Sequence, residues 1–60
     1  MKKPRYEAGD IIRDKEGFCT IIKKDGIKYK VYDCNSNGIP TKPSNYRTVA
    51  HKDIIELIHG

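Results

Sequence analysis

The fold of this chain is decided by the stretch Phe18-Cys19-Thr20-Ile21-Ile22-Lys23-Lys24-Asp25-Gly26-Ile27-Lys28-Tyr29-Lys30-Val31-Tyr32. Residues with β-branched and aromatic side chains lie on both sides of a single Asp-Gly pair, which is the pattern of two strands joined by a tight turn. The sequence therefore predicts a β-hairpin over 18–32. We expect the rest of the chain to close a small sheet over this hairpin.

Two registers of the hairpin are compatible with its sequence. A two-residue loop at 25–26 groups four side chains on one face: Thr20, Ile22, Tyr29 and Val31. A three-residue loop ending at Gly26, with a β-bulge, groups a different set: Cys19, Ile21, Ile27, Tyr29 and Val31. Because side chains alternate along a strand, both registers point Tyr29 and Val31 into the core. Both also point Lys28 and Lys30 outward.

The hairpin is expected to lie in a single small domain. The chain has 60 residues, of which 37% are hydrophobic and 33% are charged. A chain of this length buries only about 60% of the surface that its unfolded form exposes, so its margin of stability is thin. We assign residues 1–5 to a basic tail and residues 6–60 to the domain. A thin core also favours self-association, and a homodimer through edge strands is one expectation.

The sequence contains no pattern that supports catalysis. A catalytic cleft must be enclosed by more residues than so short a chain can supply. No Ser-His-Asp, Cys-His or phosphate-loop pattern is present. His51 and His59 have no Cys, Asp or Glu partner at the spacing of metal ligands. We therefore expect a non-enzymatic protein with no catalytic residue, no metal and no cofactor.

The two cysteines allow one disulfide, so the redox compartment is inferred from other features of the sequence. Cys19 lies in an apolar run, where a thiol packs as a small hydrophobic group, whereas Cys34 begins a polar loop in which it can be exposed. The sequence shows neither a signal peptide nor an apolar segment long enough to span a membrane. These features predict a cytoplasmic protein with reduced thiols and no membrane partner.

Four further segments have clear local signals in the sequence. Residues 11–13 have the composition of a first strand, and residues 14–17 have that of the turn after it. Residues 33–45 contain two prolines and several Asn and Ser residues, which oppose a central strand and indicate a long loop. Residues 46–50 predict a fourth strand.

The C-terminal residues 51–58 allow two interpretations. Four apolar residues fall on one helical face, as in an amphipathic helix: Ala50, Ile54, Leu57 and Ile58. Alternatively, residues 51–53 form a tight turn and residues 54–58 a closing strand, which we favour because the apolar run is short and begins with β-branched residues. The predicted fold class is mainly all-β, with about five short antiparallel strands and a short terminal turn or helix.

Three segments together carry a resemblance to a known architecture. Gly9-Asp10-Ile11-Ile12 is similar to the Gly-Asp-apolar entry to a first strand, residues 17–22 to a Gly-x-x-x-Ile second strand, and residues 53–58 to a closing turn and final strand. In this order, residues 6–58 resemble an SH3-like small barrel, the architecture of KOW, Tudor and chromo-type domains. The resemblance implies a small barrel-shaped domain. The lysine-rich composition is also similar to that of short phage-encoded or accessory proteins.

Basic residues gather around the predicted hairpin, and the chain as a whole has a net charge of +4. Phosphates are attracted to such a patch by charge and counterion release, and an exposed tyrosine can stack on a base. Lysines on a strand also prevent sheets from pairing edge to edge, which is a second interpretation of the patch. The first functional hypothesis is nucleic-acid binding through Lys23, Lys24, Lys28, Lys30, Tyr32 and Arg47.

The second hypothesis is a protein-interaction module. Ile39 and Pro40 lie in an otherwise polar loop, where an exposed apolar residue indicates a contact surface. The predicted protein-binding residues are Asn37, Ile39, Pro40 and Lys42. In this interpretation the chain is an adaptor or a phage-type inhibitor of a host protein.

Overall fold

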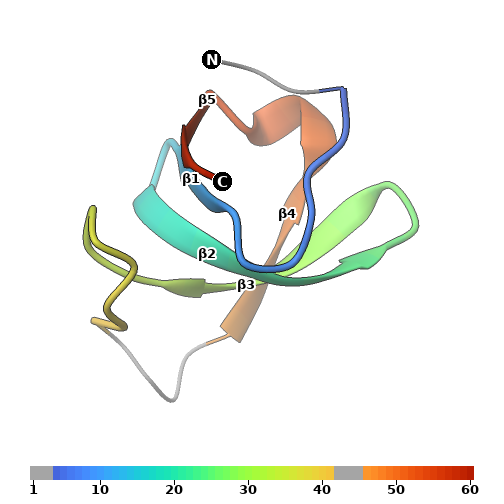
Figure 1. Ribbon diagram of the computed structural model, residues 1–60. Helices are drawn as coiled ribbons and strands as arrows, with labels where there is room; N and C mark the ends of the chain where they lie inside the picture. Colours follow the sequence, from blue (N-terminus) through green and yellow to red (C-terminus); the bar gives the residue numbers. More distant parts are fainter. Residues whose placement is uncertain (1–3, 42–45) are drawn as a thin grey trace.

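Five antiparallel strands form one sheet in the computed structural model, which describes residues 4–41 and 46–60. The elements are β1 (Ile11–Asp14), β2 (Gly17–Asp25), β3 (Lys28–Asp33), β4 (Tyr46–Ala50), the 3₁₀ turn η1 (His51–Asp53) and β5 (Glu56–His59). The strand order is β4-β3-β2-β1-β5, so the last strand pairs back onto the first. The sheet curls around its own core (Figure 1). The predicted all-β class is confirmed.

The turn of the central hairpin lies one residue later than its Asp-Gly signal indicates. Asp25 pairs with Lys28, so the two loop residues are Gly26 and Ile27. Gly26 has a φ of +67°, whereas Ile27 has no positive φ, as a type II′ turn with glycine at its first central position requires. Ile27 is 79% exposed, so its place in the core in the three-residue-loop register is wrong.

A β-bulge in β2 sets which side chains enter the core. The extra residue is Ile22, between two cross-strand pairs: Ile21 with Val31 and Lys23 with Lys30. The bulge shifts the register by one residue, and a shift of one residue exchanges the two faces of a strand. Cys19 and Ile21 therefore face the core, as do Tyr29 and Val31, whose predicted orientation is confirmed.

The core lies on the concave side of the curled sheet, and every strand contributes to it. Its buried members are Tyr6, Ile12, Cys19, Ile21, Tyr29, Val31, Val49 and Ile54, with Leu57 packed against them. Several are nearly inaccessible to solvent, which gives a 60-residue chain a small but continuous core.

Residues 4–10 cross in front of the sheet before β1 begins (Figure 1, blue). Tyr6 anchors this segment, because its buried ring packs edge-to-face on Tyr29 with centroids 5.8 Å apart. The Tyr6 backbone N–H donates a hydrogen bond to the Tyr29 hydroxyl at 3.2 Å. The His51 ring completes the cluster, 5.3 Å from the Tyr6 ring. These contacts hold the preceding residue, Arg5, near the tip of the β2–β3 hairpin.

The C-terminal residues form a turn and a strand rather than a helix. η1 turns the chain after β4, and the Ile54 backbone N–H donates to the His51 carbonyl at 3.2 Å. β5 then pairs antiparallel with β1, with Leu57 opposite Ile12. The favoured turn followed by a strand is thus confirmed, although the strand covers 56–59 rather than the predicted 54–58. The predicted strands at 11–13 and 46–50 are also confirmed, the first extending to Asp14.

The described part of the loop after β3, residues 34–41, has its own hydrogen-bonded structure. Cys34 forms a β-bridge with Pro40, and the Asn35 side-chain oxygen accepts the backbone N–H groups of Asn37 at 2.8 Å and Ile39 at 3.1 Å. This loop (yellow in Figure 1) lies at the opposite end of the molecule from the hairpin tip. Lys42, one of the predicted protein-binding residues, lies outside the described residues.

Cys34 is buried, although its position at the start of a polar loop allowed exposure. The loop folds back over β1 and β2, and the Thr20 hydroxyl donates to Cys34 Sγ at 3.2 Å. Gly38 approaches this region so closely that a Cβ there would lie 2.9 Å from Ile11 Cδ1. The loop thus covers a second, smaller buried cluster on the outer face of the sheet.

Candidate functional site

The four lysines of the predicted basic patch lie on two different surfaces. Residues directly opposite each other in an antiparallel pair project from the same face. Lys23 is opposite Lys30, and Lys28 lies two residues before Lys30 on the same outer face. In contrast, Lys24 is opposite Tyr29, whose side chain is buried, and so projects on the other side of the hairpin.

The outer surface combines these lysines with two aromatic rings. Tyr32 and Tyr46 are directly opposite each other on β3 and β4. The Lys30 ammonium lies 5.5 Å from the centroid of the Tyr46 ring, in a cation–π contact, and Tyr46 is 58% exposed. We call this surface, made of Lys23, Lys28, Lys30, Tyr32 and Tyr46, the lysine face.

Tyr46 was missed by the sequence analysis. In the sequence it is fourteen positions away from Tyr32. The two rings come together only through the register of β3 against β4, and that register cannot be predicted from the sequence between the two strands. Tyr32 is more enclosed than Tyr46, and its hydroxyl donates to the Gly38 carbonyl at 3.4 Å. Tyr46 is therefore the more accessible ring.

The structure separates Arg47 from the lysine face. Arg47 is opposite the buried Val31 and makes a bidentate pair with Asp14, through Nη1–Oδ2 at 2.7 Å and Nη2–Oδ1 at 3.2 Å. Its Nε also donates to Asp33 at 3.0 Å. The hydrogen bond to Asp14 raises the pKa of the guanidinium, which outweighs the effect of burial. The Arg47 guanidinium, which was predicted to bind phosphate, is thus already paired with two carboxylates.

Asp14 is the buried partner in this network, with a side chain only 4% exposed. Burial alone would raise the pKa of the Asp14 carboxyl. The hydrogen bonds and charge of Arg47, with the backbone N–H groups of Glu16 and Gly17, outweigh burial and hold that pKa below its ordinary value. Since Asp14 ends β1 and Arg47 lies on β4, the pair connects two strands that are not neighbours in the sheet.

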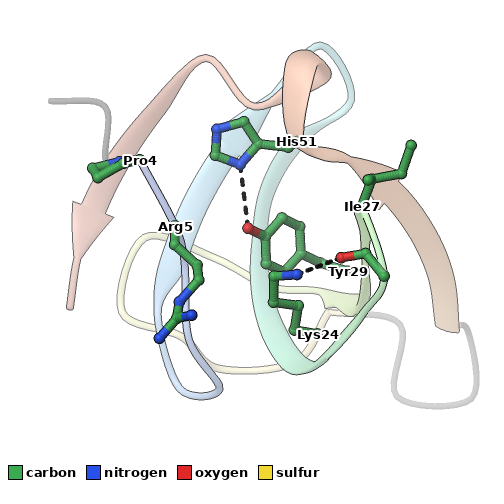
Figure 2. Close-up of a pocket in the computed structure, with 7 residues that line it drawn as sticks. Pro4, Arg5, Lys24, Ile27, Tyr29 and His51 are labelled. Atoms are coloured by element: carbon green, nitrogen blue, oxygen red, sulfur yellow. Dashed lines mark hydrogen bonds between the residues drawn. The ribbon is translucent and has the colours of Figure 1, made fainter.

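The second surface is a hollow beside the hairpin tip, on the side opposite the lysine face. Seven residues line a volume of about 390 Å³: Pro4, Arg5, Lys24, Gly26, Ile27, Tyr29 and His51 (Figure 2). We call it the hairpin-tip hollow. Its walls come from the N-terminal segment, the β2–β3 hairpin and η1. Arg5 and Lys24 give it two cationic side chains, and none of the described residues that line it carries a carboxylate.

Hydrogen bonds connect the walls of the hairpin-tip hollow. The His51 backbone N–H donates to the Ile27 carbonyl at 3.2 Å, which ties η1 to the hairpin tip. His51 Nδ1 lies 3.2 Å from the Tyr29 hydroxyl (Figure 2), leaving Nε2 as the second polar atom of the ring. The Lys24 ammonium is hydrogen-bonded to the Gly26 carbonyl, so it is held at the turn. Arg5, Ile27 and His51 carry no signal in the sequence that predicts a function for them.

The loop after β3 presents the other predicted contact residues. Ile39 is 59% exposed, and Asn37 and Pro40 are also exposed. Because Asn35 holds the loop through two side-chain hydrogen bonds, the Ile39 side chain is presented from a defined backbone. This surface and the hairpin tip lie at opposite ends of the molecule (Figure 1).

Cys19 does not have the properties of a reactive thiol. Burial raises the pKa of its thiol to about 12, so it remains protonated at neutral pH. Among residues 4–41 and 46–60, no three His, Cys, Asp or Glu side chains are placed to hold a metal ion. In the same described parts, no helix has the length and apolar character needed to cross a bilayer.

The chain was compared with known proteins at the level of family, sequence and structure. No protein-family model, no curated protein and no solved structure matches it significantly.

Proposed function

We propose that this chain is a non-enzymatic SH3-like barrel that binds nucleic acid through the lysine face. The architecture is supported by five consecutive antiparallel strands, a 3₁₀ turn before the last strand, and pairing of that strand with the first. The order of elements agrees with the resemblance in the sequence. Both cysteine thiols are free and buried, as expected of a protein that acts in the cytoplasm.

The observation that carries the proposal is the direct pairing of Lys23 with Lys30 across β2 and β3. Like charges directly opposite each other in a sheet destabilise it. Lys28 adds a third positive charge on the same face, and only Asp25, opposite Lys28, offsets it within the hairpin. A phosphate backbone laid across this face would relieve the repulsion and release its own counterions.

Tyr46 supplies a second mode of contact. Its exposed ring lies beside the Lys30 ammonium, so that a base stacked on the ring and a phosphate near the lysine belong to neighbouring positions of one strand. Stacking on an exposed aromatic side chain requires an unpaired base, because the faces of paired bases are covered by their neighbours in the duplex. The lysine face should therefore bind single strands more tightly than duplexes.

The proposal is tested by fluorescence anisotropy with a labelled 15-nucleotide single strand over a range of salt concentrations. Lys28→Glu with Lys30→Glu should abolish binding. Lys15→Glu with Lys52→Glu is the matched control, because it changes the net charge equally at exposed positions outside the lysine face. Three lysine–phosphate contacts predict a slope of roughly −2 for log K against log salt. Equal loss of binding in both double variants, or affinity independent of salt, would refute the proposal.

A second candidate function, protein binding through the loop at 34–41, is favoured by the 59% exposure of Ile39 on a hydrogen-bonded loop. Because the loop is already ordered by its own hydrogen bonds, burying Ile39 against a partner costs little conformational entropy. The test is affinity purification of the tagged chain before and after nuclease treatment. A stoichiometric protein that survives the nuclease and is lost with Ile39→Asp would assign the function to this loop.

A further inference from the structure

The hairpin-tip hollow has a ligand-binding character of its own, independent of the lysine face. Its two cations come from segments far apart in the sequence, Arg5 before β1 and Lys24 near the end of β2. His51 adds a ring whose Nδ1 is engaged with Tyr29. With two positive charges and no carboxylate among its described lining residues, the hollow attracts an anion.

The geometry of the hollow is fixed before any ligand binds. Tyr6 ties the N-terminal segment to the Tyr29 hydroxyl, Tyr29 contacts His51, and the His51 backbone contacts the Ile27 carbonyl. These three hydrogen bonds connect all three walls. A site that is already ordered loses less conformational entropy when a ligand binds, so even a few contacts can give measurable affinity.

One wall of the hollow is aliphatic rather than polar. Ile27 is the most exposed of the large hydrophobic residues in the described chain, at 79%, and Pro4 lies on the opposite segment (Figure 2). The II′ turn requires glycine only at position 26, so turn geometry does not explain an isoleucine at position 27. An exposed branched side chain that lines the same hollow as two cations suits a ligand in which an apolar group adjoins a negative one.

We infer that the hairpin-tip hollow binds an acidic-apolar peptide segment, with a carboxylate between Arg5 and Lys24 and an adjoining apolar side chain against Ile27. The planar guanidinium of Arg5 can pair with both oxygens of a carboxylate, and Lys24 contributes a point charge. The volume of about 390 Å³ is at the lower end of the range for ligand sites and is suited to one or two side chains. The partner is thus a protein that displays such a segment.

A nucleic-acid strand is a poorer match for this hollow than for the lysine face. Bases stack on accessible aromatic faces, but Tyr29 is only 1% exposed and the accessible apolar wall is Ile27. The hollow and the lysine face also project from opposite sides of the hairpin, as the pairing of Lys24 with Tyr29 and of Lys23 with Lys30 shows. One chain can therefore hold a peptide and a nucleic acid at the same time.

The test is a titration of the ¹⁵N-labelled full chain with the peptide acetyl-Glu-Leu-Asp-Leu-Glu-amide, followed in ¹H–¹⁵N correlation NMR spectra. Two control peptides replace either the acidic residues by Gln and Asn or the leucines by Ser. The amide signals of Gly26, Ile27 and His51 should shift with the first peptide and much less with either control. Arg5→Gln and Lys24→Gln should each weaken binding roughly two- to fivefold, as expected for single exposed ion pairs, and Ile27→Ser should also weaken it.

Lys15→Gln is the matched variant, since Lys15 is exposed in the β1–β2 turn and does not line the hollow. It should bind the peptide as the unchanged chain does. Equal shifts with the uncharged peptide, unchanged affinity in Lys24→Gln, or shifts confined to β3 and β4 would overturn the inference. A parallel titration with oligo-dT separates the two sites: if Lys24→Gln impairs oligo-dT binding as much as peptide binding, the hollow belongs to the nucleic-acid surface and the peptide assignment is wrong.

Discussion

Replacing Asp14 by Asn should destabilise the fold strongly, because it removes the buried carboxylate that holds Arg47. Removing one partner of a buried ion pair costs about 3–5 kcal/mol when the remaining charge has no other partner. Here Arg47 keeps its contact with Asp33, and its side chain is 27% exposed, so water can reach it. We therefore expect the free energy of unfolding to fall by about 2–3 kcal/mol, which is close to the contribution of one hydrogen bond to a charged group.

A loss of this size is large for so short a chain. A domain of 60 residues has a total stability of about 3–9 kcal/mol, and the expected loss corresponds to a decrease in Tm on the order of 10–20 °C. The assay is chemical and thermal denaturation followed by circular dichroism. A double-mutant cycle of Asp14→Asn and Arg47→Gln should give a coupling energy of at least about 1 kcal/mol.

The pH dependence provides an independent check of the same pair. The pKa of Asp14 is lowered in the folded state, from an ordinary value of 3.8, so near that pH the unfolded chain binds more protons than the folded one. The stability that this carboxylate contributes is therefore complete above about pH 5 and is lost as the pH falls through the folded pKa. The difference between the unchanged chain and Asp14→Asn should shrink as the pH falls from 6 to 3. A difference that stays constant over this range, or an Asp14→Asn loss below about 0.5 kcal/mol at pH 7, would refute the reasoning.

Three other measurements follow from local geometry. The Cys19 thiol, fully buried and with a pKa raised to about 12, should react with a thiol reagent only as fast as the chain unfolds; rapid labelling of the folded protein would contradict its burial. Gly26→Ala should lower stability by about 1–2 kcal/mol, measured by urea denaturation, because a Cβ there meets no atom and the cost is that of a positive φ alone. Tyr29→Phe should cost about 1–2 kcal/mol and deprotect the Tyr6 amide in hydrogen exchange, since that N–H loses its buried acceptor; an unchanged exchange rate would show that Tyr6 is satisfied in another way.

The strands could be predicted from sequence because each carries a local signal. The segment 46–50 has the composition of a strand, and residues 54–58 are too short and too β-branched for a stable helix. The position of the central turn could not be predicted to the residue. Asp-Gly favours a loop at 25–26, but glycine also suits the first position of a II′ turn, and this chain uses Gly26 in that way. Local chemistry allows both, and the burial of Cys19 and Ile21 on β2, which the bulge at Ile22 permits, decides between them.

The candidate site was less predictable, because it depends on one bulge and on strand pairing across a long loop. The bulge at Ile22 places Lys23 beside Lys30 and directs Lys24 to the other surface. Bulges have no reliable local signature in the sequence, so four lysines close together in the chain appear as one patch. Tyr46 joins the lysine face only through its pairing with Tyr32.

Arg13 and Arg47 form ion pairs between strands, whereas the lysines of the lysine face are exposed. This difference supports a binding function for the lysines. Arg13 pairs with Glu56 and connects β1 to β5, and Arg47 connects β4 to Asp14 on β1. Arginine suits such links because its planar fork fits a carboxylate and is less strongly hydrated than an ammonium. By fixing β4, Arg47 also fixes Tyr46 at the start of that strand. Arg47 therefore supports the lysine face as a positioning residue, and Arg47→Gln should lower stability while leaving the salt dependence of nucleic-acid binding unchanged.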